Sequence, residues 1–359
     1  MLDHVLPMQD FRMLNWTLTI CTYNRPHFLV ETLRHALRQT RLPAEIVVVD
    51  ASDDWQGHKA QMEESFADQW GEVALIYVPA EVRSLTFQRN QALRLASSDI
   101  VFSLDDDIYL RPDAAEKIMQ GYEADTQEEI AMIAGFFVDG VETPPESGSA
   151  AAPHATNRKG CLRRFLEHQL TLDSHFVPYA DPVDRGEAPA DVSAHNIVAN
   201  GLVNGGRTTF RRKFALESGW SELLRYYATH EDSDFSYRMS YHGRLLVAPD
   251  AGFFHADGNE GTASRYRVNT IRVRNLMALH VLHSPNKPRS ALRLALSFGK
   301  FLLLYLLIDS LQRRFTYPTA RAYALGLLQI PQFLFWPRTD FSNWYTAYQE
   351  EMYGTRYKS

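Results

Sequence analysis

The sequence predicts an α/β protein built on a mostly parallel sheet, and two observations support this fold class. Apolar, strand-like stretches alternate with helix-like stretches over about the first 100 residues, and each apolar stretch ends in a polar turn. Such alternation is typical of parallel strands joined by right-handed helical crossovers. The strand ends then gather along one edge of the sheet, which is where open α/β sheets bind their ligands.

The individual elements are predicted from local sequence. Runs rich in β-branched and aromatic residues predict strands, and Pro26 is well placed in the first turn of a helix. The strands are expected at residues 16–22, 45–49, 73–78, 99–104 and 244–249. The helices are expected at residues 26–39 and 83–97, from about residue 111, at 235–239 and through the C-terminal third.

Three consecutive carboxylates, Asp105, Asp106 and Asp107, directly follow the strand predicted at residues 99–104. Adjacent negative charges repel one another, so folding alone gives no reason to place them at a strand end. Mg²⁺ or Mn²⁺ would balance the charge, since both ions select oxygen ligands and commonly bind a phosphate as well. A solvated acidic turn that caps the next helix is the alternative.

A second acidic cluster, Glu231, Asp232 and Asp234, opens the helix predicted at residues 235–239. Carboxylates in a first turn are stabilised by the helix dipole, so capping is one explanation. Capping needs a single acid, however, and here three occur within four residues. His255 ends another β-like segment, as Asp107 does, and an imidazole with two carboxylates suits Mn²⁺.

The composition is that of a globular protein, with 359 residues of which 45% are hydrophobic and 22% charged. The two cysteines, Cys21 and Cys161, lack Cys or His neighbours at metal-binding spacing. This pattern favours a reducing compartment and argues against a disulfide scaffold or structural zinc. The N-terminus lacks the basic and apolar regions of a signal peptide, so we expect a cytoplasmic location.

Residues 280–359 are expected to form a basic, apolar helical region, separate from residues 1–279. They hold ten Lys and Arg against four Asp and Glu, whereas residues 1–279 hold 27 against 39. The most apolar run, residues 301–308, is shorter than the ~20 residues that span a bilayer. A buried helix and an in-plane membrane helix both fit, and nearby basic and aromatic residues favour the membrane. They are Arg289, Arg293, Lys300, Arg313, Arg314, Trp336, Trp344, Tyr345 and Tyr348.

Residues 141–190 have the composition of a loop, rich in Pro, Gly, Ser and Ala. We interpret them as an insertion over the ligand site, because the pattern of the core resumes afterwards. Such a loop is expected to close over the bound ligand and exclude water.

The order of short motifs resembles that of the family 2 glycosyltransferases, which are inverting nucleotide-sugar enzymes. The resemblance implies a GT-A nucleotide-diphospho-sugar transferase fold, with a mostly parallel Rossmann-like sheet and here a C-terminal helical appendage. It covers roughly residues 18–275. The motifs stand at residues 22–25, 48–53, 88–93, 104–107, 204–206 and 231–234 and at His255.

The resemblance also implies a role for each matching residue. It assigns Asp232 as the catalytic base with Glu231 beside it, and Mn²⁺ or Mg²⁺ as the cofactor. The implied metal ligands are Asp105, Asp107 and His255. The implied nucleotide-sugar contacts are Thr22, Tyr23, Asn24, Arg25, Asp50, Ser52, Arg89 and Asp106. Asn204, Gly205 and Gly206 are placed at the acceptor or the donor sugar. The family often has a second Asp and a Gly where this chain has Ala51 and Ser52.

The expected function is inverting, divalent-metal-dependent transfer of a sugar from a nucleotide-diphospho-sugar to a glycan or lipid-linked acceptor, as in polysaccharide biosynthesis. A metal ion can neutralise the departing diphosphate, and a separate carboxylate can deprotonate the acceptor. One alternative, a nucleotidyltransferase or sugar pyrophosphorylase, would normally carry a Gly-rich loop, which residues 22–26 lack. A non-catalytic nucleotide-sugar-binding protein is the other. A peripheral position on the cytoplasmic face of the membrane and an oligomer are left open, and no nucleic acid partner is expected.

Overall fold

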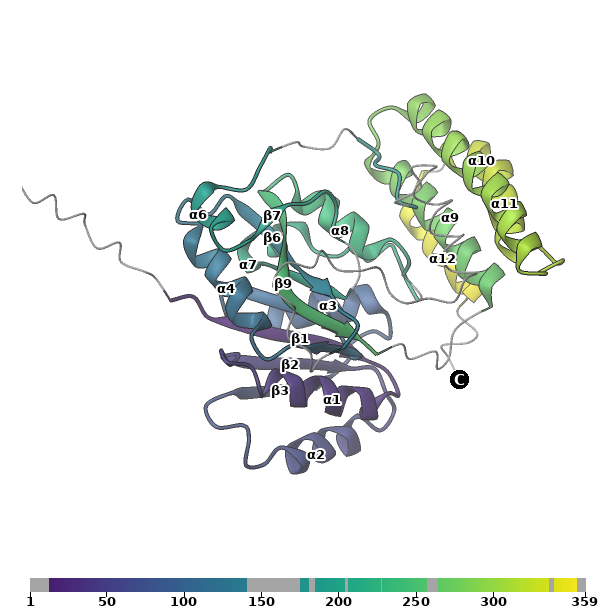
Figure 1. Cartoon of the computed structure of the whole chain (residues 1–359). Helices are drawn as coiled ribbons and strands as arrows, with labels where there is room; N and C mark the ends of the chain where they lie inside the picture. Colours follow the sequence, from purple (N-terminus) through teal and green to yellow (C-terminus); the bar gives the residue numbers. More distant parts are fainter. Residues whose placement is uncertain are drawn as a thin grey trace, which may run out of the picture.

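The computed structural model contains a mixed sheet between two layers of helices, with a further group of helices beside it (Figure 1). It describes residues 13–140, 175–180, 185–203, 206–226, 228–256, 264–335 and 339–353. Within these residues the strand order is β3 (Ala74–Pro79), β2 (Glu45–Asp50), β1 (Trp16–Thr22), β4 (Ile100–Asp105), β8 (Arg207–Arg211), β6 (Ile130–Phe137), β9 (Arg244–His255) and β5 (Ile108–Leu110). The short strand β7 (Val198–Ala199) pairs with β9.

The predicted α/β class is confirmed, and the parallel part of the sheet is β3-β2-β1-β4. Beyond β4 the sheet is mixed, because β8 runs antiparallel to both β4 and β6. The strand predicted at residues 244–249 continues as one 12-residue strand to His255. The sequence did not predict β6 and β8.

Alternate residues of the central strands face opposite helical layers, as the period of a strand requires. On β2, Ile46 and Val48 belong to the core beneath α1 (Pro26–Ala36), α2 (Trp55–Ser65) and α4 (Ala114–Ala124). Val47 and Val49 pack instead against α3 (Leu85–Leu95). Further along that second face lie α7 (Arg212–Ser218) and α8 (Glu231–Met239). The short α6 (Ala190–Ser193) lies beside α4.

The carboxyl ends of three parallel strands meet at one edge of the sheet. Thr22 of β1 pairs with Asp50 of β2, and Cys21 of β1 pairs with Asp105 of β4. The end of β9 returns to the same edge, because His255 pairs with Ile108, next to the acidic triplet. The register therefore brings together residues from four separate regions of the sequence.

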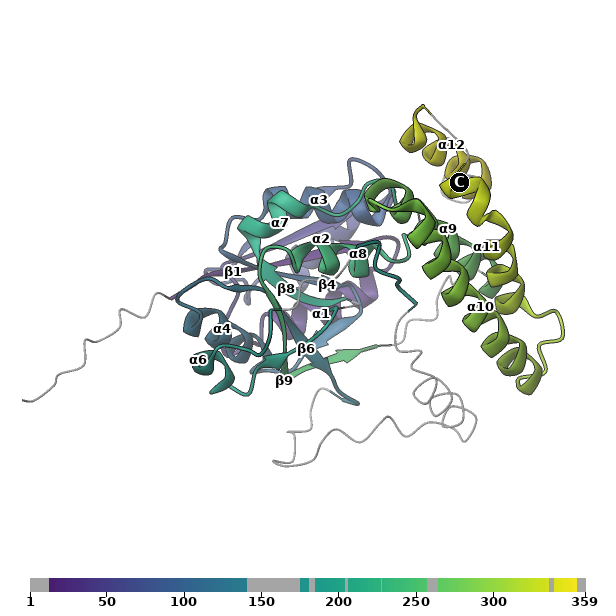
Figure 2. The same ribbon diagram turned by 90° about the horizontal axis from the view of Figure 1, so that it is seen from above.

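The C-terminal helices form a layer beside α8 with a core of its own (Figures 1 and 2). They are α9 (Arg265–His283), α10 (Lys287–Leu311), α11 (Pro318–Leu334) and α12 (Phe341–Tyr353). Their core includes Leu224 and Tyr237, which precede the layer in the sequence. The division proposed between residues 279 and 280 falls inside α9.

The apolar run at residues 301–308 is only part of a much longer helix. It lies within α10, which has 25 residues and is the one helix of the described chain that is long and apolar enough to cross a membrane. The argument that this segment is too short to span is therefore wrong. Length and composition alone are weak evidence for a span, because the core helix of a soluble protein meets the same criteria.

The structure also bears on the predicted aromatic membrane interface and on the predicted loop. The aromatics predicted for a membrane interface are largely internal: Tyr345 is fully buried, and half-buried Trp344 and Tyr348 stack on each other. That prediction is therefore wrong for Tyr345, and Trp336 lies outside the described residues. Most of the loop predicted at residues 141–190 also lies outside them, but its Tyr179 is buried and donates a hydrogen bond to Asp234 (2.9 Å).

Candidate active site

A cavity of about 900 Å³ opens at the edge where the parallel strands end, between β1, β4 and the start of α8. Eleven of the predicted site residues line it: Thr22, Tyr23, Asn24, Arg25, Arg89, Asp105, Asp106, Asp107, Glu231, Asp232 and His255. Asp50, Ser52 and Gly206 do not line it. Asn204 and Gly205 lie outside the described residues.

Asp50 lies beneath the floor of the cavity, with both carboxylate oxygens already occupied. One oxygen accepts a hydrogen bond from the backbone N–H of Ser52 (2.8 Å). The other lies 2.7 Å from the Tyr77 hydroxyl and 2.9 Å from His58 Nδ1. The Ser52 hydroxyl accepts from the backbone N–H of Asn24 (2.7 Å), whose φ is 54°. As it stands, this network holds the loop at residues 22–25 in shape.

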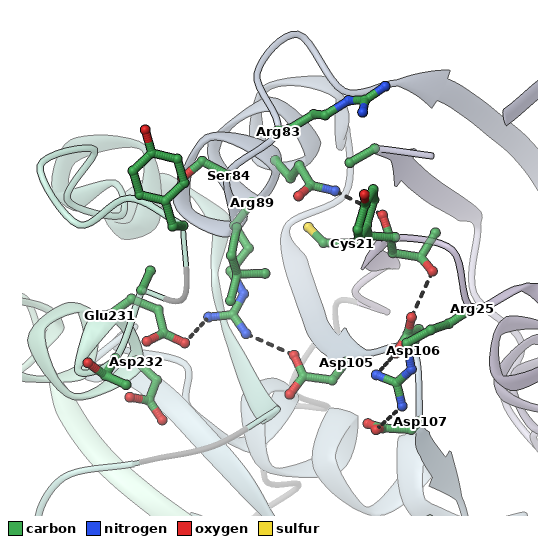
Figure 3. A pocket seen from close by; sticks show the side chains of 18 of the residues that line it. Cys21, Arg25, Arg83, Ser84, Arg89, Asp105, Asp106, Asp107, Glu231 and Asp232 are labelled. Atoms are coloured by element: carbon green, nitrogen blue, oxygen red, sulfur yellow. Dashed lines mark hydrogen bonds and ion pairs between the residues drawn. The ribbon is translucent and has the colours of Figure 1, made fainter. Parts of the chain in front are cut away.

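Arg25 binds two members of the acidic triplet. Its guanidinium lies 2.8 Å from Asp106 and 2.6 Å from Asp107 (Figure 3). Burial raises the pKa of Asp106 to about 7, although a hydrogen bond from Thr22 (2.7 Å) and the charge of Arg25 oppose the shift. Burial also acts on Asp107, but hydrogen bonds from His255 and Arg25 outweigh it and lower the pKa of Asp107. The two neighbouring acids therefore differ in charge state near neutral pH.

The donors at this end of the cavity suit a divalent ion in part. His255 Nε2 lies 3.5 Å from Asp107 Oδ1, so an imidazole and a carboxylate face one another, the donor types that Mn²⁺ accepts. Asp105 is 40% exposed but turned towards Arg89. As the side chains lie, no group of three His, Cys, Asp or Glu within the described residues could hold a metal ion. The donor chemistry fits Asp107 and His255, and Asp105 stays a predicted ligand.

Gly206 packs directly behind Asp105. A Cβ atom at Gly206 would lie 2.4 Å from Asp105 Oδ2, so a side chain there would push the carboxylate away. Gly206 therefore allows the backbone to approach an acid of the triplet closely, and its position at the acceptor or the donor sugar stays a prediction.

Arg89, on α3, joins the acidic triplet to the acidic cluster of α8 (Figure 3). Its guanidinium lies 2.9 Å from Asp105 and 3.1 Å from Glu231. Burial disfavours the charge of Arg89, but these two carboxylates outweigh burial and raise its pKa. Burial and the neighbouring Asp232 raise the pKa of Glu231 to about 8, so Glu231 is mostly protonated at pH 7.

The cavity also has lining residues that the sequence analysis did not assign. His230 directly precedes the acidic pair, and this adjacency was a signal available in the sequence. Arg272 is brought to the cavity by α9, and Arg83 by the turn before α3. No spacing pattern pointed to Arg272, because its position depends on how the C-terminal layer packs.

Comparison with known proteins finds a family model that matches part of the chain. A model of glycosyl transferase family 2 matches residues 17–179. A glucosyl-dolichyl phosphate glucuronosyltransferase from Haloferax volcanii is 26% identical over 111 residues, which are 30% of this chain and only 34% of that relative.

Solved structures that match the chain include glycosyltransferases. A mannosyltransferase from Pyrobaculum calidifontis, in complex with GDP-Man and Mn²⁺, matches with a TM-score of 0.49 and 16% identity over 94% of this chain and 80% of that one. Residues 1–349 of S. aureus TarS, in complex with UDP-GlcNAc, match with a TM-score of 0.45 and 14% identity over 90% of this chain and 93% of that one.

Proposed function

We propose that this chain, whose residues 17–179 match the model of glycosyl transferase family 2, is an inverting, divalent-metal-dependent glycosyltransferase of the GT-A fold. The donor would be a nucleotide-diphospho-sugar. The observation that carries the proposal is the convergence of the residue 105–107 triplet, His255 and the Glu231–Asp232 pair on one cavity. Arg89 ties the two acidic groups together.

In this proposal the residues at one end of the cavity bind the metal ion and the donor, and those at the other end deprotonate the acceptor. Asp105, Asp107 and His255 would hold the ion, which when bound would neutralise charge on the departing diphosphate. Arg25, already beside Asp107, is placed to contact the donor phosphates.

We assign the base to Asp232. Glu231 has a pKa of about 8 and carries a proton at neutral pH, so it is the poorer proton acceptor of the pair. Asp232 lines the cavity at the first turn of α8, which is suited to take the proton of the attacking acceptor hydroxyl. Attack from the side opposite the diphosphate would then invert the anomeric centre.

We further propose a lipid-linked acceptor and peripheral attachment at the cytoplasmic face of the membrane. The Haloferax volcanii relative is named for a dolichyl phosphate substrate. Independently, α10 exposes a row of leucines, including Leu296 (66% exposed) and Leu303 (70%). Exposed leucines beside basic residues are typical of a surface that meets anionic lipid.

The test is a thermal-shift panel of nucleoside diphosphates and their sugars, with and without Mn²⁺. A ligand at 100 times its Kd stabilises the folded state by about 2.7 kcal/mol, so one donor should raise the Tm only when the ion is present. Asp107→Asn should abolish this metal-dependent shift but keep the fold, since Arg25 retains Asp106 as a partner. Asp68→Asn, at an exposed acid in the turn after α2, is the matched control.

Asp232→Asn separates binding from turnover in the same preparation. It should keep the metal-dependent shift and lower the turnover rate by about 10²- to 10⁴-fold, the usual contribution of a general base. The proposal fails if no nucleotide stabilises the wild type, if Asp107→Asn behaves like Asp68→Asn, or if Asp232→Asn is fully active. Release of pyrophosphate would instead indicate the nucleotidyltransferase.

A further inference from the structure

Four arginines line the cavity, and one of them lacks an anionic partner. Arg25, Arg83 and Arg89 each pair with carboxylates of the chain. Arg272 instead donates to the amide oxygen of Asn269 (2.8 Å), and no carboxylate pairs with it within the described part of the chain. A guanidinium without a counterion in a cavity attracts an anion, and its planar fork suits phosphate or carboxylate.

His230 supplies a second, independent sign of a missing ligand at the same place. Its side chain lines the cavity although the residue is only 8% exposed. Its Nε2 is buried and has no hydrogen-bond partner among the described residues. Burial, and next the charge of Arg272, lower the pKa of His230, so the imidazole is neutral at pH 7 and its free nitrogen can donate one hydrogen bond.

The two side chains are fixed relative to each other and to the proposed base. His230 precedes Glu231 and Asp232 at the start of α8, while Arg272 lies on α9. One helical turn along α9, Asn275 donates to the backbone oxygen of Thr229 (3.0 Å), so α9 holds the loop that carries His230. An anion bound here would lie next to Asp232, at the end of the cavity away from Asp107 and His255.

We propose that Arg272 and His230 bind a phosphate group carried by the acceptor. Donors on α9 and on the loop before α8 can reach separate oxygens of a tetrahedral phosphate, which a planar carboxylate matches less well. The proposal rests on the proposed function, since it assigns this end of the cavity to the acceptor and the other end to the donor. The phosphate could belong to an isoprenoid lipid or to a soluble sugar phosphate.

The test is isothermal titration of the full chain with inorganic phosphate, farnesyl phosphate and farnesol, in Mn²⁺ and a saturating nucleoside diphosphate. Arg272→Gln should weaken binding of both phosphates at least tenfold and leave the metal-dependent nucleotide shift unchanged. Arg272→Lys should lie between wild type and Arg272→Gln, since it keeps the charge without the fork. Arg265→Gln, an exposed arginine on the same helix, should bind like wild type.

Several outcomes separate the possibilities. Tighter, Arg272-dependent binding of farnesyl phosphate than of inorganic phosphate supports a lipid source, and equal affinity supports the phosphate site without a lipid preference. Binding of farnesol as tight as that of its phosphate, or equal phosphate binding by Arg272→Gln and wild type, overturns the inference. If no nucleotide binds the wild type, the proposed function fails, whereas titration without nucleotide still tests Arg272.

Discussion

At the scale of residues, the cavity shows how burial gives similar side chains different charges. Asp106 and Asp107 are neighbours, yet burial raises the pKa of Asp106 and hydrogen bonds from His255 and Arg25 lower that of Asp107. The pKa of Glu231 is raised further, to about 8, although Glu231 contacts Arg89. The protein therefore limits repulsion around the cavity by keeping part of its carboxylates protonated.

This charge pattern predicts how stability depends on pH. The folded-state pKa of Glu231, about 8, lies above its ordinary value of 4.5, so the folded state holds a proton that the unfolded state releases. The contribution of Glu231 is therefore full below about pH 4.5 and is lost as the pH rises through 8. Glu231→Gln should gain free energy of unfolding relative to wild type progressively between pH 5 and pH 8, as measured by urea denaturation without ligands.

The difference between variant and wild type isolates Glu231 from buried histidines such as His280, whose lowered pKa acts in the opposite direction. The exposed Glu72→Gln is the control and should show no such trend. A constant difference from pH 5 to pH 8 for Glu231→Gln would contradict the prediction.

The acids singled out in the sequence line one cavity, and the residues that the sequence did not reveal were missed for a physical reason. Residues 105–107 and Asp232 could be found because strand ends and helix starts converge in an α/β sheet. The protein partners of Asp50 could not be found from the sequence, since Tyr77 and His58 reach Asp50 from separate elements. Arg272 was missed because its place depends on tertiary packing of a helix about 40 residues beyond the acidic pair.

At the scale of elements, the C-terminal helices hold the loop that directly precedes the proposed base. Asn275 of α9 is fully buried and donates to the backbone oxygen of Thr229, two residues before Glu231. Tyr345 of α12 in turn donates to Asn275 Oδ1 (2.8 Å). This chain of hydrogen bonds makes the layer part of the site, whereas the sequence alone indicated an appendage.

Tyr345→Phe should therefore affect turnover as well as stability. Loss of the Tyr345 hydroxyl leaves the side-chain oxygen of Asn275 without its hydrogen-bond donor. This loss costs about 1–3 kcal/mol of folding free energy and loosens the loop before Glu231. We expect a lower Tm and a turnover rate reduced about tenfold, with the metal-dependent nucleotide shift retained. Tyr348→Phe, one turn along the same helix, is the control: it should lower the Tm without this loss of turnover. Equal turnover in the two variants would argue against positioning.

Element prediction succeeded where strands and helices alternate regularly along the chain. Strands β1 to β4 follow one another with helices between them, so their alternating pattern sufficed. Strands β6 and β8 did not stand out, because β8 is inserted between β4 and β6 and its pairing is set by distant segments. The two-residue β7 is too short to carry any periodic signal.

At the scale of the whole molecule, the C-terminal layer combines an excess of basic residues with a face of exposed leucines. Residues 284–335 hold seven Lys and Arg and a single acid, Asp309, which is fully buried. On α10, Leu292, Leu296, Leu303, Leu307 and Leu311 are 47–70% exposed at helical spacing. The opposite side of α10, with Phe301 and Tyr305, packs against His175 at the cavity wall.

This face fits an anionic membrane better than a second copy of the chain. In a symmetric pairing two equally basic faces would repel each other, whereas each basic residue near an anionic leaflet contributes about 1 kcal/mol. The leucines would add the burial of their side chains, about 1.5–3 kcal/mol for each one fully transferred. The cavity wall behind α10 would then lie close to the lipid surface, where a lipid-linked acceptor is presented.

Flotation with vesicles that contain anionic lipid tests this orientation. The wild type should float at low salt, and less of it at high salt, because screening weakens the charge attraction. Leu303→Gln combined with Leu307→Gln should reduce binding at least tenfold, since each loss of about 1.4 kcal/mol is a factor of ten. Leu216→Gln, at a leucine of α7 that is 45% exposed, should float like wild type. If the double variant floats as well as the wild type, the leucines do not bind the membrane. If it converts a dimer into a monomer in solution, the face binds a second copy of the chain instead.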